Sequence, residues 1–97
     1  MRLVVMFEEG NDMGPVRERL ELDHLAFLER HRDEIPMAGG LRREHGGPYV
    51  GGMWVFEVET RARAVELIEQ DPYYRIHPRK YRLLVWGKAL PDYQVLM

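Results

Sequence analysis

His24 is the residue of this chain whose type and position most directly suggest chemistry. It lies in a stretch whose apolar side chains and histidines recur every three or four residues, which places them on one face of a helix. The members of this stripe are Val16, Leu20, His24, Phe27, Leu28, His31 and Ile35. Burying an imidazole without a hydrogen-bond partner costs about 1–3 kcal/mol, so we expect His24 to contact a polar group from elsewhere in the chain. The alternative is an ordinary core histidine.

Asp71 is the distant carboxylate that we expect to be this partner, because it stands between the end of a predicted helix and Pro72, where the backbone is restricted. The carboxylate nearest in sequence, Asp23, points about 100° away around the helix. A carboxylate held against one imidazole nitrogen fixes the tautomer and raises the basicity of the other nitrogen, as a general base requires. The pair His24 and Asp71 therefore predicts proton transfer. The alternative for Asp71 is a cap or turn residue.

Five further residues are candidates to line the same site. Gly39 and Gly40 begin a predicted strand without side chains, so a ligand can approach the backbone there. A bulge or bend is the alternative. Tyr73, Trp54 and Arg42 are candidates to line the site or to orient a substrate. Core packing is the alternative for Trp54, and solvent exposure is the alternative for Arg42.

The elements that must position these residues follow the order strand, helix, two strands, helix, strand. Strands are predicted over 1–7, 37–43, 53–59 and 81–86, and helices over 15–35 and 61–70. The second helix is expected to follow an N-cap at Thr60, and residues 44–52 to form a glycine-rich hairpin connection. This order predicts one domain over residues 1–97 with an α+β, ferredoxin-like βαββαβ fold, a four-stranded antiparallel sheet with two helices on one face.

The predicted sheet carries apolar residues on both faces of three strands, whereas two helices can cover only one face. An uncovered apolar face of that kind exceeds the patch that monomers usually expose. A chain of 97 residues also buries little more than about 60% of the surface that it exposes when unfolded. We therefore expect a homodimer in which two sheets pack face to face about a two-fold axis, with a higher oligomer left open.

The composition argues against several other functions. The chain has no cysteine, which excludes disulfides, thiolate zinc sites and a cysteine nucleophile. Its net charge of −2 gives no drive toward nucleic acid, and the arginines within 61–63 and 79–82 are interpreted as solvated surface. No apolar run reaches the ~20 residues that span a membrane, and the amino terminus lacks a signal-peptide pattern, so we expect a cytoplasmic protein.

Cofactor, metal and RNA sites are not indicated by the sequence. The glycines within 44–52 fit neither phosphate-binding fingerprint. Histidines at four positions are available to a metal, but no pair has the i, i+4 spacing of a helical metal site: His24, His31, His45 and His77. RNA binding on such a sheet needs basic and glycine positions that the strand at 53–58 lacks. We expect no cofactor and no metal.

Three short segments carry a family resemblance: Asp23-His24-Leu25-Ala26-Phe27-Leu28, Ala38-Gly39-Gly40 and Asp71-Pro72-Tyr73. Together they resemble the YCII (YciI-like) family over roughly residues 1–88. The resemblance implies a dimeric α/β barrel related to muconolactone isomerase, with an active site on the histidine and the aspartate, here His24 and Asp71. One branch of that family is a dehydrochlorinase of chlorinated hydroxyquinols. The chain departs from the family pattern at Gly40, where proline is common, and at Arg75-Ile76-His77-Pro78, where a glycine is often found.

The residues and the resemblance together predict a small cofactor-independent enzyme of the lyase or isomerase type. In this hypothesis His24 and Asp71 move a proton on a small, cyclic or aromatic substrate. The alternative is a non-catalytic module of the same fold that binds or senses a small ligand through the same pair. Turnover of small molecules separates the two hypotheses.

Overall fold

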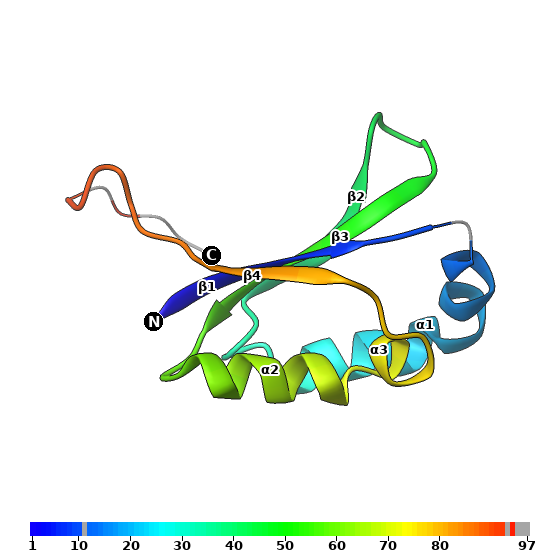
Figure 1. Cartoon of the computed structure of the whole chain (residues 1–97), viewed down its shortest axis with the longest axis horizontal. Helices are drawn as coiled ribbons and strands as arrows, with labels where there is room; N and C mark the ends of the chain where they lie inside the picture. Colours follow the sequence, from blue (N-terminus) through cyan, green and yellow to red (C-terminus); the bar gives the residue numbers. More distant parts are fainter. Residues whose placement is uncertain (11, 93, 95–97) are drawn as a thin grey trace.

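The fold is one antiparallel sheet with helices on a single face (Figure 1). The structure, a computed structural model, describes residues 1–10, 12–92 and 94, so parts of the expected domain at 11, 93 and 95–97 lie outside it. The strands are β1 (Arg2–Glu8), β2 (Met37–Arg42), β3 (Tyr49–Glu57) and β4 (Tyr81–Val85), and the helices are α1 (Met13–Arg30), α2 (Arg61–Gln70) and α3 (Pro72–Ile76). The sheet order β2-β3-β1-β4 confirms the predicted ferredoxin-like α+β fold.

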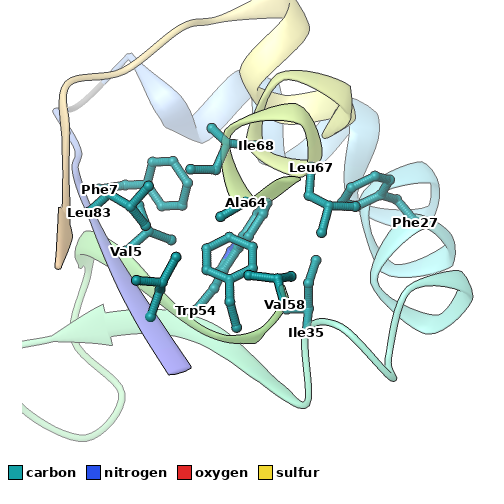
Figure 2. Close-up of a cluster of buried hydrophobic side chains, with 12 residues drawn as sticks. Val5, Phe7, Phe27, Ile35, Trp54, Val58, Ala64, Leu67, Ile68 and Leu83 are labelled. Carbon is teal, nitrogen blue, oxygen red and sulfur yellow. The ribbon is translucent and has the colours of Figure 1, made fainter. Parts of the chain in front are cut away.

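The hydrophobic core lies between the sheet and the helices. Alternate residues of β1, Leu3, Val5 and Phe7, are buried, because successive side chains of a strand point to opposite faces. They meet Trp54 and Phe56 of β3, which are also buried. Figure 2 shows Val5, Phe7 and Trp54 of this cluster gathered with side chains of the helices, such as Leu67. The predicted inward face of the third strand is therefore confirmed.

Helix α2 begins as the sequence predicts. The Thr60 side chain accepts a hydrogen bond of 3.1 Å from the Arg63 backbone N–H, which is the expected N-cap. From this start, Ala64, Leu67 and Ile68 point into the core and are fully buried. The cap and the apolar stripe together fix how α2 lies on the sheet.

Two boundaries differ clearly from those predicted. Helix α1 ends at Arg30 instead of Ile35, because a turn follows in which the His31 backbone N–H bonds to two carbonyls, Glu29 and Phe27. Ile35 lies beyond the helix but is still buried in the core, and for this reason its apolar side chain continues the spacing that predicted a longer helix. Strand β3 begins at Tyr49, so the hairpin connection is shorter than residues 44–52.

The glycines before Met53 belong to strand β3 because another backbone approaches them closely. A Cβ on Gly51 would lie 2.5 Å from the Phe7 carbonyl oxygen, and Gly51 pairs with Glu8 in the sheet. Glycine therefore serves close strand packing here, whereas the sequence pattern indicated a loop. The short helix α3 was not predicted either, although Pro72 suits its first position.

The face of the sheet opposite the helices carries exposed apolar side chains. Met6 of β1 and Leu84 of β4 are 39% and 41% exposed, and Met37 of β2 is 57% exposed. Figure 1 shows no helix on this side. None of the described helices is long and apolar enough to cross a membrane.

Candidate functional site

The side chains of His24 and Asp71 are in contact at the junction of α1, α2 and α3. His24 Nδ1 lies 2.5 Å from Asp71 Oδ1, and Asp71 is fully buried. The His24 side chain keeps 13% of its surface exposed. The contact that the sequence predicts is therefore present, while the chemical role of the pair stays a prediction. A carboxylate facing Nδ1 favours a proton on that nitrogen and leaves Nε2 available to a ligand.

The backbone around Asp71 explains why its carboxylate is held in place. Asp71 is both the C-cap of α2 and the N-cap of α3, and Pro72 follows it at the first position of α3. Its second oxygen, Oδ2, accepts a hydrogen bond of 3.3 Å from the Tyr74 backbone N–H. The two interpretations of Asp71, cap and histidine partner, hold together, because each uses a different oxygen.

Tyr73 packs flat against the imidazole. The ring centroids of Tyr73 and His24 are 3.9 Å apart with an angle of 11° between the planes. Burial raises the pKa of the Tyr73 hydroxyl, although the Arg17 charge opposes the shift, so the hydroxyl is neutral near pH 7. With Asp71 on one nitrogen and Tyr73 on one face, the imidazole is held in a single orientation.

Two ion-pair partners near this pair, a half-buried arginine and a glutamate with a buried side chain, were not predicted. Glu9, which follows β1, binds Arg17 through both oxygens, at 3.0 Å to Nε and 2.6 Å to Nη2. Burial lowers the pKa of Arg17, but the hydrogen bonds and charge of Glu9 outweigh burial and leave it raised. Arg17 precedes His24 by two helical turns on the same face, and this spacing is the sequence signal that could have revealed it.

Arg79 corrects an interpretation made from the sequence. It was interpreted as solvated surface, but only 6% of its side chain is exposed. Its guanidinium carbon lies 4.4 Å from the centre of the Phe7 ring. Its terminal nitrogens are 3.6 Å from Glu9 Oε1 and 3.8 Å from Asp71 Oδ2. The basic residues within 79–82 show no periodic pattern that would distinguish the buried Arg79 from its exposed neighbours.

A cavity of about 300 Å³ opens beside these groups, between α1 and the β2–β3 part of the sheet. Five of the seven predicted site residues line it: His24, Gly39, Gly40, Trp54 and Tyr73. Phe7, Arg17, Tyr49 and Arg79 line it as well. Asp71 lies behind His24 and does not line the cavity. The volume is twice the roughly 150 Å³ that accommodates benzene in an engineered cavity, so one ring with substituents fits.

Arg42 lies elsewhere than expected, and the two glycines, although both line the cavity, have different surroundings. Arg42 lies outside the cavity and donates a hydrogen bond of 2.6 Å to the Tyr49 hydroxyl, with its guanidinium over the Tyr49 ring. A Cβ on Gly40 would overlap the Tyr49 ring, whereas a Cβ on Gly39 would meet nothing within 4 Å. At Gly40 the Tyr49 ring therefore takes the space beside the backbone, and the approach of a ligand to Gly39 and Gly40 stays a prediction. Within the described residues, no three histidine, aspartate or glutamate side chains are placed to hold a metal ion.

The fold and the site define an α+β protein that has a small cavity beside a histidine and a buried carboxylate. A comparison with protein families matches residues 1–86 to the YCII-related domain, and the chain belongs to this family. No curated protein matches the sequence. Among solved structures, the chain is similar to 5-chloro-2-hydroxyhydroquinone dehydrochlorinase from Burkholderia phenoliruptrix in complex with 2,5-dihydroxybenzoquinone. The two share 20% identity and a TM-score of 0.78 over 90% of this chain and 94% of that chain, a likeness that establishes the fold.

Proposed function

We propose that this protein is a cofactor-independent enzyme of the lyase or isomerase type that moves a proton on a small cyclic or aromatic substrate. The observation that carries the proposal is the contact of 2.5 Å between His24 Nδ1 and a fully buried Asp71, with His24 lining a cavity. The similar solved structure is a dehydrochlorinase bound to a one-ring compound, which supports a substrate of this size.

In the proposed mechanism His24 Nε2 takes a proton from the bound substrate and returns it to another atom of the substrate or to the departing group. Asp71 keeps the imidazole in the tautomer with a free Nε2 and stabilises the imidazolium that forms. Tyr73 stacks on the ring and resists its rotation. In this proposal His24 is the catalytic residue, and Asp71 and Tyr73 position it.

Proton exchange in heavy water tests the proposal at its first step, because a proton that leaves His24 for the solvent before it is returned is replaced by deuterium. A proton returned without exchange is detected through the product instead. The full chain is incubated with a panel of hydroxylated benzenes, including 5-chloro-2-hydroxyhydroquinone, and small lactones. NMR then follows exchange of carbon-bound protons and formation of products. We expect His24→Ala to lower the rate for an active compound by about 10²- to 10⁴-fold, and Asp71→Asn to lower it less.

His45→Ala is the matched control, because His45 is exposed in the β2–β3 connection and does not line the cavity. It should keep the full rate. Equal rates for the wild type and His24→Ala would contradict the proposal. Tight binding of panel compounds with no exchange or turnover of any of them would instead support the alternative, a module that binds or senses a small ligand.

We also propose that two copies of the chain pair through the uncovered face of the sheet. Exposed Met6, Met37 and Leu84 supply an apolar surface of the kind that proteins bury. Sedimentation at micromolar concentration should give twice the chain mass of 11.5 kDa. Leu84→Glu should shift the protein to monomer, whereas Leu22→Glu, on a side chain of α1 that is 83% exposed, should leave the dimer intact. A wild-type monomer would refute this pairing.

A further inference from the structure

Arg79 is a buried cation that the described part of the chain pairs only incompletely with hydrogen-bond acceptors. Its Nε is a buried side-chain atom without a hydrogen-bond partner. Its terminal nitrogens approach Glu9 and Asp71 no closer than 3.6 and 3.8 Å, which exceeds hydrogen-bond distance. A guanidinium carries five N–H donors, and leaving such donors unpaired in a protein interior is costly.

The neighbouring carboxylates do not supply these bonds, because they are held by other partners at positions beyond hydrogen-bond distance from Arg79. Both oxygens of Glu9 bind Arg17. In Asp71, Oδ1 contacts His24 and Oδ2 accepts from the Tyr74 backbone. The two carboxylates therefore compensate the charge of Arg79 through space but leave its donors free. Burial lowers the pKa of Arg79, although Asp71 and Glu9 oppose this shift, and an arginine remains protonated at neutral pH.

The free donors belong to a residue that lines the cavity. Arg79 and His24 both line it, and both approach the carboxylate of Asp71, from different oxygens. The other cavity arginine, Arg17, already pairs its charge with Glu9 through Nε and Nη2, and the acidic residue of the lining, Glu21, is exposed. An anionic oxygen on a molecule in the cavity would find its unoccupied partner in Arg79.

We propose that the ligand of this cavity is a one-ring compound with an oxyanion, a carboxylate or an ionised phenol, and that the Arg79 guanidinium binds this oxyanion. The planar fork of arginine matches carboxylate geometry with two parallel hydrogen bonds, and charged hydrogen bonds of this kind are among the strongest. The proposal rests on the proposed function in taking the same cavity as the ligand site. It adds a substrate class and a residue that selects it.

Calorimetric titration of the full chain with matched probes tests the proposal. Benzoate is compared with benzamide, and 4-nitrophenolate with 4-nitroanisole, each pair at a single pH at which the first member is ionised. We expect the wild type to bind at least one anion about tenfold or more tightly than its neutral partner. The pair that shows the preference identifies the oxyanion as carboxylate or phenolate. Equal affinity within both pairs would overturn the proposal.

Variants of Arg79 assign the preference to this side chain. Arg79→Gln should abolish the preference for the anion, and Arg79→Lys should retain part of it. Arg82→Gln is the matched control, because Arg82 is exposed in β4 and pairs with Met6 on the opposite sheet face, and it should keep the full preference. Retention of the full preference in Arg79→Gln would overturn the assignment.

A measurement on the wild type covers the case in which Arg79→Gln fails to fold. In protein labelled with ¹⁵N, saturating amounts of the preferred anion should shift the Arg79 Nε–H resonance, and its neutral partner should not. An unmoved resonance would overturn the proposal. Its failure is distinguishable from failure of the proposed function. Arg79-dependent binding without any proton exchange would refute catalysis alone, and exchange of neutral compounds with no anion preference would refute only the role of Arg79.

Discussion

The two halves of the helix layer cover the same sheet face in opposite ways. Helix α2 presents Ala64, Leu67 and Ile68, which are fully buried against apolar side chains of the sheet. Helices α1 and α3 instead bring His24 and Asp71 together and leave a cavity of about 300 Å³. Apolar packing fills space without direction, whereas buried polar groups must be oriented toward partners. Closely packed apolar contacts therefore define one half, and the other half combines core residues such as Phe27 of α1 with the candidate chemistry.

Leu67→Ala should have the largest effect on stability and should leave the cavity half intact. It removes a fully buried side chain from the closely packed half, which typically lowers the free energy of unfolding by about 2–5 kcal/mol. Denaturant unfolding measures the loss, and benzoate titration measures the cavity. A loss below about 1 kcal/mol, or a large change in benzoate affinity, would contradict the division between the two halves.

Asp71→Ala should be the next largest change, through lost hydrogen bonds instead of lost packing. It leaves His24 Nδ1 and the Tyr74 backbone N–H without their acceptor, which costs about 1–3 kcal/mol. Asp71→Asn should cost less, because asparagine is also a good N-cap and retains one oxygen acceptor. Thermal unfolding of the two variants gives this order, and a larger loss for Asp71→Asn would argue against the capping role.

Gly40→Ala should change the cavity more than the stability. An alanine Cβ would overlap the Tyr49 ring, which is 39% exposed and can move aside. Moving Tyr49 alters the cavity wall and withdraws the ring from Arg17, whose guanidinium lies 4.0 Å from its centre. Affinity for benzoate should fall by a few-fold. Gly39→Ala, where a Cβ meets nothing within 4 Å, is the control and should bind benzoate as the wild type does.

The smallest effect is expected at the surface ion pair between Glu34 and Arg63. The Arg63 guanidinium binds both oxygens of Glu34 at 2.8 Å and lowers the pKa of that carboxyl from its usual 4.5. A lowered pKa in the folded state stabilises the fold above about pH 4.5, and this contribution is lost as pH falls through the folded-state pKa. Arg63→Gln should cost less than about 1 kcal/mol at pH 7, and the difference should vanish in acid. A difference that persists in acid would exclude this origin.

The sheet and the His24–Asp71 contact could be predicted because both leave periodic or positional signals. Alternation of apolar residues indicates the buried strands, and the imidazole in an apolar stripe requires a distant partner. Asp71 was identifiable because Pro72 restricts the backbone beside it. Each of these signals can be read from neighbouring residues in the sequence, and in the folded chain the two side chains are in contact.

The residues that were misassigned lacked such local signals. Arg79 is buried by Phe7 and by two carboxylates from distant segments, which nothing in its neighbours indicates. The start of β3 was missed because glycines are typical of loops. The reason for glycine at position 51 is the Phe7 backbone, which lies against it only in the folded chain. Arg42 was expected in the site, but its partner Tyr49 draws it outside the cavity. In each case a tertiary contact overrides the local pattern.

The strand order also determines when the protein can fold. β1 occupies an inner position and pairs with β3 and β4, although β4 spans Tyr81–Val85 near the other end of the chain. Pairings between segments so far apart in sequence slow folding, because the chain loses conformational entropy on closing the loop before the stabilising contacts form. During synthesis β4, which pairs with one edge of β1, is made only after nearly all of the described chain. That edge of the apolar β1 therefore stays unpaired until then. We expect chaperones to bind nascent chains that are stalled before β4.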